Sequence, residues 1–168
     1  MTRSFLYHGS DNKNLFIIKP HKQSVRHNDE GAVIFATLDE AYAYAFTVRS
    51  RGRYRQDISR WSLDGVKSPW HIIIDNEAAF RHTDLGGAVY RVAAASFVID
   101  EEYDNGTPEW TARAAVVPVD KVSFTSSLKA MIEQGLYIHF VTPEVFDQIK
   151  SGKNHGWDIV KDLPVVQE

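Results

Sequence analysis

The chain has 168 residues, which suits one domain with a core of its own. Its formal net charge of −3 gives no overall attraction to nucleic acid or anionic lipid, and the absence of cysteine excludes disulfides, thiolate nucleophiles and cysteine-based zinc sites. No apolar run approaches the roughly 18 residues that span a bilayer, and the first residues lack a signal-peptide pattern, so we expect a cytoplasmic protein without membrane contact.

The N-terminal part of the chain predicts short strands separated by irregular segments. Residues 5–7 have the pattern of a strand, and a polar region follows that ends in a surface loop over 20–30. The apolar run over 32–36 is typical of a buried strand. An alanine- and aromatic-rich segment over 41–46 then predicts a helix, with Thr37 as its expected N-cap.

The rest of the chain continues in the same manner. Residues 49–69 are irregular and basic at their start, and one helical turn is expected over 77–82. A helix of roughly eight residues is predicted with Ser126 or Ser127 as its cap and Gly135 as its end, and Thr142 opens a final helix with Pro143 in its first turn. Strands are predicted over 70–75, 88–92, 96–99, 110–119, 122–124 and 137–141. Without regular βα alternation, this pattern favours an α+β fold in a single domain over 1–168, with a loosely attached tail over 157–168.

Three short motifs follow one another in a distinctive order. A strand ends in His-Gly-Ser at residues 8–10, an apolar strand and a helix follow from Gly31, and Glu109 stands at the mouth of a later apolar strand. This order resembles the ADP-ribosyltransferase family of the poly(ADP-ribose) polymerase and diphtheria-toxin type. The resemblance covers roughly residues 4–47 and 105–125, and it implies two small packed antiparallel sheets with few flanking helices and a cleft between them.

The resemblance implies that the first motif binds the nicotinamide half of NAD, used as a co-substrate. His8 would bond the 2′-hydroxyl of the nicotinamide ribose, the backbone of Gly9 would pair with the carboxamide, and Ser10 would lie against the same ribose. From the residues alone, a lone histidine at a strand end more often bonds a backbone carbonyl. Glycine in the motif favours close approach of a ligand to the backbone.

In the second motif, Phe35 and Ala36 fit the family pattern, and Ile34 stands where the family has the tyrosine that stacks on nicotinamide. An aromatic residue of the following helix would supply a second stacking surface, and Tyr44 is our candidate, with Tyr42 and Phe46 as alternatives one or two residues away. Packing along one helix face is an equally good explanation for Tyr42 and Phe46, which are four residues apart.

Glu109 is the candidate on which catalysis depends. A carboxylate in this position can bond the ribose hydroxyl and stabilise the positive charge that develops as the glycosidic bond breaks. The apolar stretch that follows Glu109 resembles the family's glutamate segment. Glu101 and Glu102 are nearby alternatives that lack this strand context.

The strongest charge cluster consists of alternating arginines at 49, 51, 53 and 55, followed by Arg60. Such a cluster suits a clamp on the NAD pyrophosphate, for which Arg53 is the candidate, or a landing site for nucleic acid or an acidic protein. A solvated loop that offsets acidic neighbours is the plain alternative. The seven histidines show no metal-ligand spacing, so we expect no metal site.

Two hypotheses therefore remain open. The first is an NAD-dependent transferase of the glycosyltransferase class, a mono-ADP-ribosyltransferase or NAD glycohydrolase, with His8 and Glu109 as catalytic residues and a protein, nucleic acid or small molecule as acceptor. The second is a non-catalytic module that uses the same cleft to bind a nucleotide or a partner. RNA 2′-phosphotransferases share the fold and consume NAD, but the arginine pattern of their phosphate site has no match here.

Overall fold

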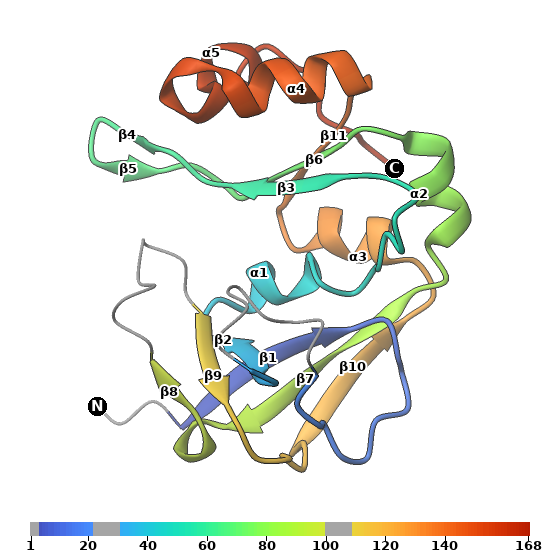
Figure 1. The fold of residues 1–168 in the computed structure, drawn as a ribbon, viewed down its shortest axis with the longest axis vertical. Coiled ribbons are helices and arrows are strands. Elements are labelled where there is room, and N and C mark those ends of the chain that lie inside the picture. Colours follow the sequence, from blue (N-terminus) through green and yellow to red (C-terminus); the bar gives the residue numbers. More distant parts are fainter. Residues whose placement is uncertain (1–3, 22–30, 100–108) are drawn as a thin grey trace. The chain divides into compact units, whose positions relative to one another are not determined.

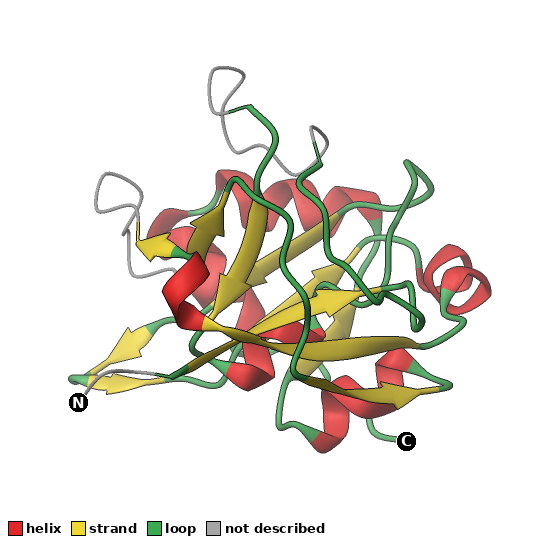
Figure 2. Cartoon of the chain, turned by 90° about the horizontal axis from the view of Figure 1, so that it is seen from below, coloured by secondary structure: helices red, strands yellow, loops and turns green. Residues whose placement is uncertain are grey.

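A computed structural model describes residues 4–21, 31–99 and 109–168, and it confirms an α+β fold with small sheets and few helices (Figure 2). The contacts divide the chain into two compact units. Unit 1 consists of Met1–Thr47 and Gly86–Thr125, and unit 2 consists of Val48–Leu85 and Ser126–Glu168. All residues with a role in the resemblance except Arg53 belong to unit 1.

Unit 1 is built on a six-stranded sheet in the order β10-β7-β1-β2-β9-β8, in which every neighbouring pair is antiparallel (Figure 1). One short helix, α1, and a 3₁₀ turn over Ala94–Ser96 accompany the sheet. The elements are β1 (Phe5–Ser10), β2 (Ile34–Thr37), α1 (Glu40–Tyr44), β7 (Gly87–Ala93), β8 (Val98–Ile99), β9 (Glu109–Ala112) and β10 (Asp120–Phe124).

Side chains alternate in direction along each strand, and this shows which face of the sheet packs against the main hydrophobic core. Successive side chains of a strand point to opposite faces, and directly paired residues of antiparallel strands share a face. Leu6 is paired with Val92, and both are fully buried. The same face carries Ile34, Ala36, Ala88, Tyr90 and Ala112 in one apolar cluster.

Helix α1 covers the opposite face of the sheet, and Gly9 is the reason it can lie so close. A Cβ built on Gly9 would lie 2.0 Å from the carbonyl oxygen of Ala43 and 3.2 Å from the Cβ of Phe46. Asp39, and not Thr37 as predicted, caps the helix: its carboxylate accepts a bond from the backbone N–H of Tyr42 at 3.3 Å. The predicted N-cap is wrong because Thr37 still belongs to β2, where its hydroxyl accepts from the N–H of Asp39 at 3.0 Å.

Substituting Gly9 by alanine is expected to destabilise the protein by about 2 kcal/mol, because the new methyl group overlaps a backbone carbonyl that can move only with α1. Chemical denaturation measures this loss. Gly52→Ala is the matched control: Gly52 has open space around it and a φ of +77°, so only backbone strain of about 1 kcal/mol is expected. Equal losses in the two variants would contradict the packing of α1 on Gly9.

Unit 2 contains a three-stranded sheet in the order β11-β6-β3, with α4 and α5 on one side and α3 on the other (Figure 1). The central strand has three consecutive isoleucines, Ile72, Ile73 and Ile74, all fully buried, as expected of a strand that is covered on both faces. The elements are β3 (Gln56–Ser59), β4 (Ser62–Leu63), β5 (Val66–Lys67), β6 (His71–Ile74), α2 (Glu77–Thr83), α3 (Ser127–Glu133), β11 (Tyr137–Phe140), α4 (Pro143–Ser151), a 3₁₀ turn (Lys153–Gly156) and α5 (Trp157–Val160).

Several predictions for unit 2 are confirmed and others are wrong. Ser126 caps α3, Thr142 caps α4, and Gly135 takes a positive φ of +81° after α3. The segment 49–69, expected to be irregular, contains β3 and the β4–β5 hairpin. β11 runs parallel to β6, so this sheet is mixed and not purely antiparallel.

The last residues are packed in place and do not form the loose tail that the sequence suggested. Val160 is buried, and the N–H of Val166 donates to the carbonyl of Ile138 on β11 at 2.9 Å. Glu168 pairs with Arg81 of α2. The sequence did not predict this packing, because 157–168 has only isolated apolar residues, which pack against other segments without forming a periodic pattern of their own.

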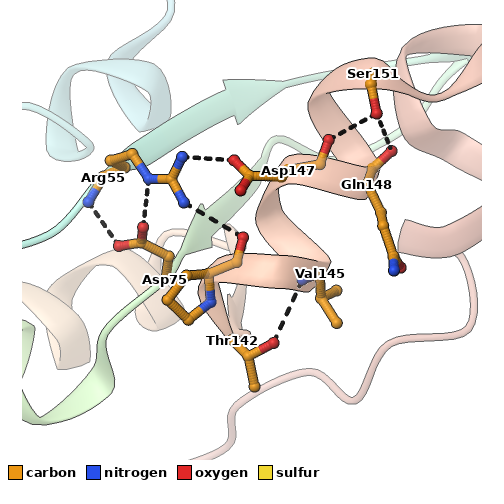
Figure 3. A network of polar contacts seen from close by, with 8 residues as sticks. Arg55, Asp75, Thr142, Val145, Asp147, Gln148 and Ser151 are labelled. Carbon is orange, nitrogen blue, oxygen red and sulfur yellow. Dashed lines mark hydrogen bonds and ion pairs between the residues drawn. The ribbon is translucent and has the colours of Figure 1, made fainter.

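Arg55 ties three parts of unit 2 together (Figure 3). Its Nε donates to Asp75 at 2.5 Å, its Nη1 donates to Asp147 at 2.6 Å, and its Nη2 donates to the carbonyl of Pro143 at 3.3 Å. The guanidinium also lies 4.5 Å from the centre of the Phe146 ring. One arginine of the basic cluster therefore has a structural role, and Arg60, stacked at 4.2 Å on Trp70, is a second.

We expect Arg55→Met to lower the free energy of unfolding, because it leaves the buried carboxylate of Asp75 without its guanidinium. Asp147→Asn breaks only the exposed arm of the same network and should cost less than about 1 kcal/mol. Urea denaturation of both variants tests the ranking, and a larger loss for Asp147→Asn would refute it.

Candidate functional site

The three predicted motifs lie on neighbouring strands of unit 1, in the spatial order β1-β2-β9. Tyr7 is paired with Thr37, and Thr37 is paired in turn with Glu109. These three residues form one row across the sheet, and their side chains share the face that α1 covers. Glu109 therefore lies two strands away from the His-Gly-Ser motif and close to the helix that follows the second motif.

The ladder between β1 and β2 is much shorter than the ladder on the other side of β1. All six residues of β1 pair with β7, whereas Tyr7–Thr37 is the single β1–β2 pair among the described residues. Continued in register, the ladder would place Gly9 opposite Phe35. Backbone N–H and C=O groups that leave a ladder need other partners. The two strands thus part at the glycine of the first motif.

The side chain of His8 lies at the point where β1 and β2 separate. Its Nδ1 lies 2.7 Å from the carbonyl oxygen of Phe35. A carbonyl only accepts, so Nδ1 carries the proton and Nε2 is the acceptor of the neutral ring. The side chain of His8 thereby binds a backbone group of β2, which is the plain role that the residues alone suggested for a histidine at a strand end.

The structure places His8 and Glu109 on opposite faces of the sheet. His8 follows Tyr7 in β1, so its ring shares the core face with Leu6 and is 6.5 Å from the ring of Tyr90, its partner on β7. Glu109 shares the α1 face with Tyr7. The two candidate catalytic side chains do not converge, and Gly9 is the member of the first motif that faces α1.

Glu109 is half-buried, and α1 holds its carboxylate. The hydroxyl of Tyr42 donates to Oε1 of Glu109 at 3.0 Å. The hydroxyl of Tyr7 lies on the same face and is influenced by Glu40 at the start of α1. Burial, followed by the charge of Glu40, raises the pKa of Tyr7. Two tyrosine hydroxyls and two carboxylates thus gather where α1 lies on β1, β2 and β9.

The aromatic residues of α1 have different surroundings. Tyr44 is buried and stacks on Phe124 of β10, with ring centres 5.4 Å apart and planes inclined by 18°, so the structure gives this candidate a packing role. Tyr42 and Phe46 form an edge-to-face pair at 5.0 Å. Phe46 is 40% exposed, which makes it the ring of this segment best able to stack on a ligand.

The remaining candidates are accounted for individually. Ile34 is buried in the apolar cluster, and Phe35 is half-buried on the α1 face. Ser10 is buried, and its hydroxyl accepts from the N–H of Asn12 at 3.1 Å. Arg53 is exposed in a turn of unit 2, where its N–H donates to the carbonyl of Ser50 at 2.9 Å.

Some candidates lie outside the described residues. They are Glu101, Glu102 and most of the loop at 20–30.

Two residues of the site escaped sequence reasoning. Tyr7 was predicted only as a strand residue, and Tyr42 as an alternative stacking ring or as a packing residue of the helix face. The pairing of the Tyr42 hydroxyl with Glu109 joins residues 67 positions apart, and it depends on the register of β2 with β9 and on the rotation of α1. Neither quantity can be read from spacing in a single sequence.

None of the protein-family models, curated proteins and solved structures compared with the chain matches it. Within the described part of the chain, no three histidine, aspartate or glutamate side chains are grouped so that they could hold a metal ion. No helix of that part has both the length and the apolar character needed to cross a membrane.

Proposed function

We propose that unit 1 has an ADP-ribosyltransferase-like fold, binds NAD and transfers its ADP-ribosyl group, with release of nicotinamide. The observation that carries the proposal is the parting of β1 from β2 at Gly9, beside β9, the strand that carries Glu109 and pairs with β2 on its other edge. An amide ligand can complete an interrupted ladder because it offers the same N–H and C=O groups as a strand. The carboxamide of nicotinamide is such a ligand.

The reaction requires the protein only to hold NAD in position and to place a negative charge beside the ribose. The bond between the anomeric carbon of the ribose and the nicotinamide nitrogen breaks, and nicotinamide leaves with the electron pair. The carboxylate of Glu109 stabilises the positive charge that develops on the ribose. A nucleophile of a protein, a nucleic acid, a small molecule or water then bonds to the anomeric carbon and loses its proton to solvent.

Tyr42 is the natural positioning residue for this carboxylate, since its hydroxyl donates to Oε1 at 3.0 Å. Phe46 offers a ring surface beside it. Gly9 contributes through its backbone, whereas His8 acts by holding the carbonyl of Phe35 where the strands part. In this arrangement His8 fixes the position of the β2 backbone, and Glu109 stabilises the positive charge that develops on the ribose.

A non-catalytic binding module is the second candidate, and two observations favour it. Ile34, in the position of the family's stacking tyrosine, is buried in the core and offers no surface to a ring. The carboxylate of Glu109 already has a partner in Tyr42. Such a module would hold NAD or a related nucleotide without cleaving it.

The test is to mix the intact protein with NAD labelled in the nicotinamide ring, with and without cell lysate as a source of acceptors. Release of free nicotinamide above a protein-free blank is expected. Binding of NAD by calorimetry without release would favour the binding module, and absence of both binding and release would refute the two nucleotide hypotheses together.

A further inference from the structure

Unit 2 contains a cavity that the proposed function does not use. Its volume is about 340 Å³, within the range of small-molecule sites. The lining is mostly apolar and comes from the β4–β5 hairpin, from β11 and from α5 and the residues after it. Leu63, Val66 and Tyr137 line it and are among the exposed large apolar side chains of the chain. Exposed apolar side chains gathered around a hollow are typical of a ligand site.

Two buried histidines stand at the wall of this cavity. His71 of β6 is 4% exposed, His139 of β11 is fully buried, and both belong to the lining. Their side chains are in contact between the parallel strands, with Nδ1 of His71 2.8 Å from Nε2 of His139 and the ring planes inclined by only 3°. Nδ1 of His139 lies 2.9 Å from the carbonyl oxygen of Pro164.

The carbonyl of Pro164 decides where the protons are. It can only accept, so Nδ1 of His139 carries the proton and donates to it. Nε2 of neutral His139 must then accept, and Nδ1 of His71 must donate. In this chain of hydrogen bonds, His71 donates to His139 and His139 donates to Pro164, so Nε2 of His71 is left as an acceptor at the start of the chain. The tautomers follow from the partners, as they must where hydrogens are not seen.

Nε2 of His71 has no hydrogen-bond partner among the described residues. It is also not one of the fully enclosed polar atoms that lack a partner, which are found in Tyr54, Arg91 and Trp110. Since His71 lines the cavity, its Nε2 atom is accessible from it. Burial, followed by the neighbouring ring of His139, lowers the pKa of His71 to about 4, so the ring is neutral at pH 7.

The side chains around His71 indicate which shape of ligand the cavity can accept. The rings of Tyr137 and Trp157, which both line the cavity, stand edge-on to the imidazole of His71 with centres 5.2 and 5.9 Å away. Such a frame suits a flat apolar molecule, because aromatic edges and faces pack favourably on it. Lys67 and Lys161 also line the cavity and disfavour a cation there.

We propose that this cavity binds a small, flat, uncharged aromatic compound with one hydroxyl or ring N–H group, which donates to Nε2 of His71. Phenols and indoles are the simplest members of this class. Donation into Nε2 extends the chain of hydrogen bonds from the ligand through His71 and His139 to the carbonyl of Pro164. The apolar body of the ligand covers the exposed side chains of Leu63, Val66 and Tyr137.

The test compares 2-naphthol with 2-methoxynaphthalene, which has nearly the same ring body and no hydroxyl donor, by calorimetry with the full chain. We expect the wild type to bind the naphthol about tenfold more tightly, the effect of one hydrogen bond. His71→Asn should remove this preference, because an asparagine amide can still donate to His139 but does not reach the position of Nε2. The near-UV circular dichroism spectrum of the variant, compared with that of the wild type, serves as its folding control.

A second measurement needs no variant. In wild-type protein with ¹⁵N-labelled histidine, the Nε2 signal of His71 should shift on addition of the naphthol and stay in place with the ether. Equal affinity of the wild type for both compounds would overturn the proposal, as would a preference that persists in His71→Asn or the absence of binding by either. Failure of NAD binding would leave this proposal intact, because the two sites share no residue.

Discussion

Glu109→Gln is expected to reduce nicotinamide release from NAD about 100- to 1,000-fold, the loss typical for removal of one preorganised electrostatic group. Glutamine keeps the shape of the side chain and its bond from the Tyr42 hydroxyl, but it carries no charge. The affinity for NAD should change little, because the charge acts mainly when the glycosidic bond breaks. Single-turnover release of labelled nicotinamide, together with calorimetric NAD titration, separates the two effects.

Tyr42→Phe is the matched control for this experiment. It keeps the ring that packs on Phe46 and removes only the hydroxyl that holds Oε1 of Glu109. We expect a loss of about tenfold or less, since one hydrogen bond is removed and the carboxylate stays in place. If Glu109→Gln released nicotinamide at the wild-type rate, Glu109 would not be the catalytic carboxylate and the proposed arrangement would be wrong.

Acidification is expected to destabilise the protein through the histidine pair of unit 2. The pKa of His71 is lowered from 6.5 to about 4 in the folded protein, first by burial and then by His139. Between these two values the unfolded chain binds a proton that the folded chain does not, so the free energy of unfolding falls as the pH falls. The 2.5-unit difference corresponds to about 3 kcal/mol at pH 4 and below.

Burial also lowers the pKa of His139, while its bond to Pro164 raises it, so the pair acts in one direction overall. Urea denaturation between pH 7 and pH 4 measures the loss, and His71→Asn should show a shallower decline because it has no ring to protonate at this position. Wild-type and variant curves with the same slope would contradict the buried, neutral state of His71. Proton NMR titration of the His71 ring reports its pKa directly.

The sequence predicted the elements whose signals are local. The strands at β1, β6, β7 and β11 were identified because their apolar runs lie between turn residues. The starts of α3 and α4 were identified because a hydroxyl residue before a helix is a short-range pattern, although the choice between Ser126 and Ser127 was left to the structure. β3 and the β4–β5 hairpin were missed, since they are short, are half-exposed or exposed, and are defined by pairing with distant or neighbouring strands.

The candidate site was predicted in part. The order of the three motifs anticipated three strands, and the structure places them side by side as β1, β2 and β9. The roles of single side chains were not accessible in this way. His8 and Glu109 point to opposite faces because Tyr7, and not His8, is in row with Thr37 and Glu109, and a register shift of one residue would reverse this.

The sequence by itself determined the class of fold, the positions of its apolar strands and the chemical groups that the chain can offer, because these depend on residue type and on neighbours within a few positions. Only the tertiary structure decided which groups meet. It paired Tyr42 with Glu109 across 67 positions and His71 with His139 across 68, and it parted β1 from β2 at Gly9. Such contacts follow from strand register and helix packing, which minimise buried polar groups and voids over a whole unit and leave no pattern in any short stretch of sequence.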